Sequence, residues 1–231
     1  MTTEKSREVK LHYQYQQKMS QKYKVYIADD HTLFRKAMVN LLKTFSNIIE
    51  VKDAENGKEL LSLIKMNAPD LAIVDLQMPI MDGAETCEQI IQKYPNVKII
   101  VLTMHDSDRY VLHMMEMGVH AFLLKNTEPD ELEKAILSVI EKDFYHNEWV
   151  VSIMRKNVKA KRPNFTNDEL TDREKQIVQL VCQELSSKQI ADRLSVSERT
   201  IENHRATVMK KLGVKNTIGL VHYAYQIGIM G

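Results

Sequence analysis

Cysteine is scarce in this sequence of 231 residues, which also lacks long apolar runs and internal repeats. Its only cysteines, Cys87 and Cys182, lie far apart and do not have the spacing of metal ligands. We therefore expect packed or free thiols in a reducing compartment. No segment approaches the roughly 18 apolar residues that cross a bilayer, and residues 1–22 are too polar for a signal peptide. The sequence predicts a cytoplasmic protein.

Charge is divided unevenly along the chain, although the formal net charge is only +1. Residues 23–141 hold 12 Lys and Arg against 19 Asp and Glu, whereas residues 142–165 hold 6 against 2. Residues 166–231 are nearly balanced, with 9 against 8. An acidic part, a basic connector and a near-neutral part indicate two modules with different partners.

Short apolar runs alternate with amphipathic stretches from Tyr23 onward. The runs that read as strands are "KVYIAD", "IIEVKDA", "DLAIVDL", "VKIIVLT" and "AFLLK". Apolar residues at helical spacing predict helices over residues 32–45, 57–66, 84–94, 106–117 and 128–143. Five such units predict a doubly wound, five-stranded parallel sheet of the α/β class. Apolar residues in 1–22 follow no clear period, so this segment is expected to form a disordered N-terminal extension. Met19 is a candidate for the true first residue of the protein.

Polar side chains follow four of the five expected strands. Asp29 and Asp30 end the first strand, Asp75 the third, Thr103 the fourth and Lys125 the fifth. Because the carboxyl ends of parallel strands lie on one edge of the sheet, these groups can converge. Clustered carboxylates bind Mg²⁺, and a carboxylate beside a metal and a lysine can attack phosphorus. Taken singly, each residue could be an ordinary helix cap, strand residue or surface charge. Their presence together at matching strand ends favours a functional site of this kind.

Four segments of residues 23–143 carry a resemblance to the receiver domain of bacterial response regulators. They are "ADDH" (28–31), "DLQMPIMDG" (75–83), "LTMHD" (102–106) and "AFLLKN" (121–126). The resemblance implies a flavodoxin-like fold with Asp75 as the phospho-acceptor. It also implies that Asp30, Asp75 and the carbonyl of Gln77 bind Mg²⁺, with Asp29 joining through water.

The same resemblance implies a conformational switch. Thr103 and Lys125 would hold the phosphoryl oxygens, and Thr103 would move toward them. Phe122 would be the rotating aromatic that fills the vacated space, at a position where the family often has tyrosine. Phosphorylation would thus bias a two-state element through a local charge of about −2.

A second module is expected after a linker over residues 144–165, which is basic, contains a proline and lacks a periodic apolar face. Within residues 166–231, Thr171 and Glu174 form a capping box before an apolar-periodic helix. A second helix is expected over Ser187–Leu194, and a third runs from the cap at Ser197 to Leu212. The short "SVS" connection between the last two is typical of a helix-turn-helix.

The third helix of this module has one apolar and one polar face. Its apolar face is interrupted only by Arg205. The segments "LTDREKQIV", "SSKQIADRLSVSERTIENH" and "KKLGV" resemble the LuxR/NarL-type DNA-binding domain, which often has glycine where Glu184 stands. The resemblance implies base contacts from Glu202, Asn203 and Ala206. It implies phosphate contacts from Arg199, Thr200, His204, Arg205 and Lys210, although His204 fits an interface or capping role equally well.

The pattern is best explained by a transcription regulator of a two-component system, phosphorylated on Asp75 by a sensor histidine kinase. The nearly neutral second module should bind DNA weakly alone, and an amphipathic helix over Val214–Met230 could pair two copies on a two-half-site promoter. We expect no enzyme activity beyond self-phosphorylation from a phosphodonor and slow autodephosphorylation.

Two other readings belong to different classes of protein. An aspartyl-phosphate hydrolase of the haloacid dehalogenase type needs a second acid two residues after its nucleophile, where Gln77 stands. The other alternative is an orphan regulator or interaction protein whose output needs no phosphorylation.

Overall fold

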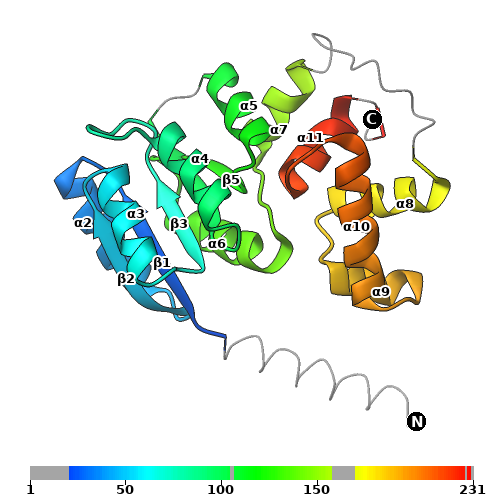
Figure 1. Cartoon of the computed structure of the whole chain (residues 1–231), viewed down its shortest axis with the longest axis horizontal. Coiled ribbons are helices and arrows are strands. Elements are labelled where there is room, and N and C mark those ends of the chain that lie inside the picture. The colour runs from blue at the N-terminus through cyan, green and yellow to red at the C-terminus, as the bar shows by residue number, and fades with distance from the viewer. Residues whose placement is uncertain (1–20, 105–106, 158–169, 227, 230–231) are drawn as a thin grey trace.

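The computed structural model describes residues 21–104, 107–157, 170–226 and 228–229 (Figure 1). Its first part, here called the sheet domain, has one five-stranded parallel sheet with the strand order β2-β1-β3-β4-β5. The strands are β1 (Tyr23–Ala28), β2 (Ile48–Ala54), β3 (Leu71–Val74), β4 (Lys98–Thr103) and β5 (Ala121–Leu124). The predicted doubly wound fold is therefore confirmed, and the carboxyl ends of all five strands lie on one edge.

Helices cover both faces of the sheet. On one face lie α2 (Thr32–Thr44) and α6 (Pro129–Lys142), which pack against alternate residues of the strands. On the other lie α3 (Gly57–Met66), α4 (Gly83–Lys93) and α5 (Asp108–Met117). The central strand β3 is buried along its whole length, as its apolar run predicted. The expected start of α5 at Asp106 lies outside the described residues.

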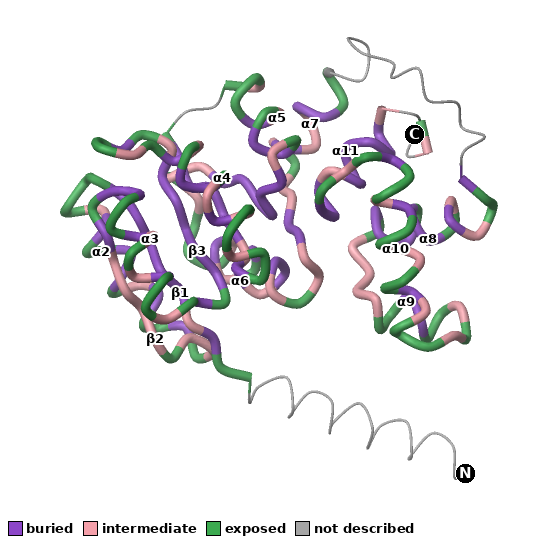
Figure 2. Tube along the Cα trace, in the orientation of Figure 1, coloured by how far each residue is buried: buried purple, intermediate pink, exposed green. Residues whose placement is uncertain are grey.

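The expected linker over residues 144–165 is wrong in its first half, because this segment contains helix α7 (Glu148–Asn157). Val150, Ile153 and Met154 of α7 are fully buried, with spacings of three and one that follow one helical face. Figure 2 shows buried stretches along α7. The basic residues just after this short apolar stripe hid its period in the sequence. Residues 158–169 lie outside the described part of the chain.

In the second part, here called the helical domain, the described residues form four helices. They are α8 (Asp172–Cys182), α9 (Ser187–Leu194), α10 (Glu198–Leu212) and α11 (Thr217–Gln226). The predicted capping box of Thr171 and Glu174 is present, and the Ser197 side chain caps α10 by accepting from the amide of Thr200. The α9–α10 pair forms the expected helix-turn-helix. No helix in the described ranges is long and apolar enough to span a membrane.

Helix α11 joins the two domains. It packs against α8 within the helical domain and against α5 and α7 on the other side, and most of its residues are buried. Just before it, the Asn216 side-chain amide donates to the carbonyls of Gly118 and Val119, at 2.6 Å each. The Thr217 hydroxyl donates to Asp143 at the end of α6. The helix that was expected to pair two copies is thus covered by the chain's own sheet domain.

Glu184 occupies a backbone conformation that favours glycine. It has a φ of 60°, and its amide and that of Leu185 donate to Val181 and Leu180, which is the bond pattern of a Schellman motif at the end of α8. Its carboxylate lies 3.6 Å from Lys142 and 3.9 Å from His146 of the preceding domain. Glutamate at this position therefore strains the backbone, and the two ion contacts that it gains are long.

Replacing Glu184 by glycine should raise the free energy of unfolding of the helical domain by about 1 kcal/mol, because the left-handed conformation costs a residue with a Cβ atom roughly that much. The lost ion contacts are half-exposed and contribute less. Urea unfolding followed by circular dichroism measures the effect. Glu184→Ala is the control, since it removes the carboxylate and keeps the Cβ atom. Equal changes in the two variants would contradict the strain at this position.

Candidate phosphoryl-acceptor pocket and DNA-binding helix

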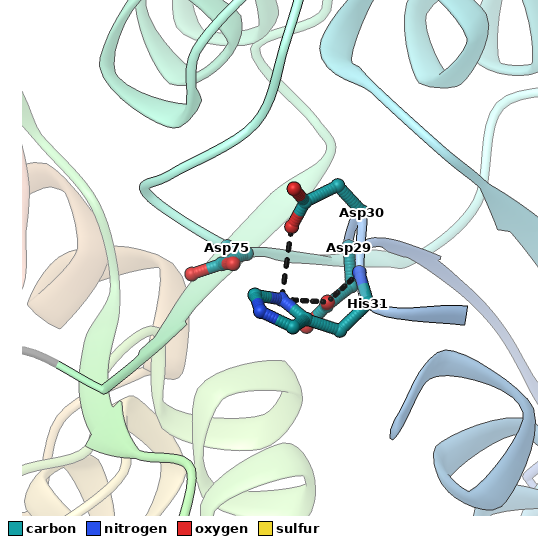
Figure 3. A group of neighbouring side chains, drawn as sticks. All are labelled: Asp29, Asp30, His31 and Asp75. Atoms are coloured by element: carbon teal, nitrogen blue, oxygen red, sulfur yellow. Dashed lines mark hydrogen bonds and ion pairs between the residues drawn. The ribbon is translucent and has the colours of Figure 1, made fainter. Parts of the chain in front are cut away.

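The carboxyl ends of the strands form one acidic pocket, as predicted. Asp29 follows β1, Asp75 follows β3, and both are almost completely buried. The Lys125 amine, which follows β5, lies 2.7 Å from a carboxylate oxygen of each. Asp30 lies at the exposed rim (Figure 3). Three chain segments that are far apart in sequence therefore meet at one ion-paired centre.

Burial and charge act in opposite directions in this pocket. Burial raises the pKa of the Asp75 carboxyl, although Lys125 and the backbone of Gln77 partly offset this by stabilising its charged form. Burial alone would lower the pKa of Lys125, but its hydrogen bonds to Asp29 and Asp75 outweigh burial and raise it. Lys125 therefore stays charged, and Asp75 is a desolvated carboxylate beside a fixed cation.

The loop after Asp75 folds tightly against the acceptor. The Gly83 amide donates to the carbonyl of Leu76, and a Cβ atom at Gly83 would collide with the carbonyl oxygen of Asp75. Glycine is required there, which explains the "MDG" of the motif. Thr103 is fully buried at the end of β4, and its carbonyl accepts from the amide of Lys125. Gln77 is exposed, and its backbone hydrogen-bonds to the Asp75 carboxyl.

The donor set fits a hard divalent cation. Ligand atoms of Asp29, Asp30, His31 and Asp75 all lie within 4.8 Å of one another. Three of the four are carboxylates, the ligands that Mg²⁺ takes in small number while it keeps water. Sequence reasoning missed His31, whose Nδ1 lies 2.9 Å from Asp30 and 3.4 Å from Asp29. The "DDH" sequence was the available signal for this rim residue.

Phe122 is fully buried on β5 and contacts the interdomain helix α7. Its ring centroid lies 5.7 Å from that of Trp149, the only tryptophan of the chain. Further along α7, Arg155 lies over the ring of Tyr225 in α11. The strand that carries Lys125 is thus connected through α7 to the helical domain, a link that the expected linker did not include.

The polar stripe of α10 points to solvent. Its exposed residues are Arg199, Glu202, Asn203, Ala206 and Lys210. Thr200 and His204 are half-buried at its edge, where the hydroxyl of Thr200 lies 2.7 Å from that of Ser197. The sheet domain covers α11 and leaves this stripe exposed in the described structure.

Arg205 is the exception among the expected DNA contacts. Its guanidinium points into the domain and donates to the hydroxyls of Ser187 at 2.7 Å and Thr217 at 2.5 Å. Burial lowers its pKa, and the nearby carboxylate of Asp143 opposes this. In this structure Arg205 ties α9 to α11 from the inner face of α10, so its contact with a phosphate stays a prediction.

Two family models match successive parts of the chain. The response regulator receiver domain matches residues 25–137, and the model of bacterial regulatory proteins of the luxR family matches residues 168–224. The chain is a LuxR-type response regulator. The receiver match contains the acidic pocket, and the luxR match contains α8 to α10 and most of α11.

Similar proteins include full-length regulators. The oxygen regulatory protein NreC of Staphylococcus carnosus is 33% identical over 209 residues, which cover 87% of this chain and 96% of NreC. The transcriptional regulatory protein DegU of Brevibacillus brevis is 30% identical over 84% of this chain and 89% of DegU. Among solved structures, the RcsB–DNA complex matches with a TM-score of 0.55 and 25% identity, over 89% of this chain and 99% of that chain.

Proposed function

We propose that this response regulator controls transcription by accepting a phosphoryl group on Asp75 from a sensor histidine kinase. The observation that carries the proposal is the buried Lys125 amine held between Asp29 and Asp75, in a chain that also presents an exposed recognition helix. NarL of Escherichia coli, a nitrate/nitrite response regulator, is 29% identical over 87% of this chain, which supports the same class of output.

The chemistry of the pocket is phosphoryl transfer to a carboxylate. An oxygen of Asp75 forms the new bond to phosphorus while the bond to the donor's leaving group breaks. Lys125 neutralises charge on the transferring oxygens, and Thr103 offers them a hydroxyl from β4. Mg²⁺, held by Asp30, Asp75 and the Gln77 carbonyl with Asp29 behind water, would supply further charge neutralisation. Apart from this self-phosphorylation and a slow autodephosphorylation, the proposal includes no enzyme activity.

The proposed partners are a histidine kinase and promoter DNA. Phosphorylation would release α11 from α5 and α7, so that two copies can pair through it on a two-half-site DNA. The RcsB structures with DNA, one of them described as two dimers on two parallel DNAs, support this assembly by similarity. Action on the bacterial genome implies a cytoplasmic location.

A small phosphodonor tests the proposal and separates it from the alternatives. The full chain is incubated with acetyl phosphate and Mg²⁺, and its mass is followed over time. We expect one phosphoryl adduct that needs Mg²⁺ and is labile to base. The absence of any adduct, with unchanged DNA binding, would favour the phosphorylation-independent regulator, and rapid continuous release of phosphate would favour a hydrolase.

Different residues of the recognition helix should contact the DNA bases and the phosphate backbone. Asn203 can pair bidentately with adenine, so Asn203→Ala should cost about 1–3 kcal/mol at one base position and relax specificity there. Lys210 lies further along the stripe, so Lys210→Ala should weaken binding to DNA of every sequence similarly. It should also reduce the dependence of affinity on salt concentration by about one charge. Binding titrations across salt, on a preferred site and on one scrambled at the half-sites, measure both. The reverse pattern in the two variants would mean that the helix docks differently.

A further inference from the structure

Arg35 is a buried arginine directly behind the acidic pocket. It lies on α2, its exposed fraction is only 2%, and it is among the largest fully buried side chains of the described structure. Its Nη1 donates to the backbone carbonyl of Asp29 at 2.5 Å. Its Nε donates to Asp53, which lies near the end of β2, at 3.1 Å, and its Nη2 donates to Glu55, which follows β2, at 2.7 Å. One guanidinium thus joins α2, the end of β1 and the end of β2.

The bond to the Asp29 carbonyl fixes the peptide that precedes Asp30. The amide of Asp29 is already held by the carbonyl of Ala54, and its carboxylate oxygens are held by Lys125 and the amide of His31. The Asp29 carbonyl is the remaining polar group of this residue, and a buried carbonyl without a donor costs free energy. Arg35 supplies that donor, so it determines the direction in which Asp30 leaves the strand.

The charge of Arg35 is paired with two carboxylates beside the pocket. Two of the groups that Arg35 contacts, Asp53 and Glu55, lie outside the pocket, and Lys36 also pairs with Asp53 at 2.8 Å. Arg35 links this outer group of charges to the Asp29 carbonyl. The planar guanidinium presents donors on three sides at fixed angles, whereas the three donors of a lysine ammonium radiate from one nitrogen and cannot reach acceptors that lie this far apart.

We propose that Arg35 is a positioning residue that sets the divalent-cation affinity of the acceptor pocket by holding the Asp29–Asp30 peptide. This inference rests on the proposed function, since it concerns the cation that would assist phosphorylation of Asp75. Partners behind metal ligands typically change metal affinity by about 10–100-fold when they are replaced. Arg35 acts through the backbone of Asp29 and needs no contact with the cation or the phosphoryl group.

The test compares Arg35→Lys with the full wild-type chain by two measurements. Isothermal titration with Mg²⁺ alone measures cation affinity without any phosphodonor. The rate of phosphorylation by acetyl phosphate over a range of Mg²⁺ concentrations separates the half-saturating concentration from the maximal rate. We expect Arg35→Lys to bind Mg²⁺ about tenfold more weakly, while the rate at saturating Mg²⁺ stays within about twofold. Arg35→Gln should show a larger loss of affinity because it also removes the charge.

Lys36→Met and Glu55→Gln are the matched controls. Each removes one member of the outer group of charges and leaves the bond from Arg35 to Asp29 intact, so both should bind Mg²⁺ like the wild type. Urea unfolding is measured for all variants. If Arg35→Lys lowers stability but leaves Mg²⁺ affinity unchanged, or if the controls weaken Mg²⁺ equally, the inference is overturned. A wild-type chain that binds Mg²⁺ but accepts no phosphoryl group would instead refute the proposed function.

Discussion

Replacing Asp75 by asparagine should abolish phosphorylation of the chain by any donor. The amide has no negatively charged oxygen to attack phosphorus, and it is a poorer ligand for Mg²⁺ than a carboxylate. Because asparagine has nearly the same shape and Lys125 can still pair with Asp29, the fold should persist. The measurement is the mass of the protein after incubation with acetyl phosphate and Mg²⁺, with circular dichroism to verify folding.

Asp82→Asn is the matched control for this variant. Asp82 lies in the same loop, is exposed, and caps α4 by accepting from the amide of Glu85. Asparagine caps helices about as well as aspartate, so this variant should be phosphorylated at the wild-type rate. An acid-stable, base-labile adduct that persists in Asp75→Asn would show that another residue accepts the phosphoryl group.

Replacing Asn216 by aspartate should separate the two domains without phosphorylation. The carboxylate keeps the oxygen that accepts from the Gly219 amide and caps α11. It loses the amide donor and places a negative charge against the carbonyl oxygens of Gly118 and Val119. Leaving two buried acceptors unpaired costs about 1–3 kcal/mol, which shifts the opening equilibrium by about tenfold or more. Dimer formation and DNA affinity of the unphosphorylated chain should rise accordingly.

Two measurements and one control variant test the effect of Asn216→Asp. Sedimentation measures dimer formation, and the fluorescence of Trp149, the only tryptophan, reports on packing between α7 and the sheet domain. Asn56→Asp makes the same chemical change at another buried helix cap, where the side chain accepts from the amide of Glu59 and makes no contact with the helical domain. If Asn216→Asp and Asn56→Asp have the same effect on DNA binding, the Asn216 contact does not hold the domains together.

The sheet domain was predictable because its signals are local. Each strand is a short apolar run, each helix has its own apolar stripe, and topology alone brings the strand ends together. Topology alone therefore predicts that Asp29, Asp75 and Lys125 share one pocket. The prediction of α10 was equally local, because its exposed stripe follows from 3.6 residues per turn.

The features that the sequence did not reveal depend on contacts between distant segments. Arg35 reads as one more charged residue of α2, and only the fold brings the Asp29 carbonyl and the end of β2 around it. Arg205 was assigned to DNA because the family pattern was followed, although its position on the apolar face already indicated an inward side chain. The burial of α11 depends on α5 and α7, and α7 itself was concealed by the basic residues at its end.

DNA binding of the full chain with and without a phosphoryl mimic tests the central claim most directly. Genomic DNA fragments are first selected with the chain loaded with beryllium trifluoride and Mg²⁺, and affinity for a selected site is then titrated for the loaded and unloaded chain and for Asp75→Asn. Loading should strengthen binding and produce a dimer on a two-half-site DNA, and Asp75→Asn should not respond. Equal affinity and equal mass in all three samples would contradict this claim.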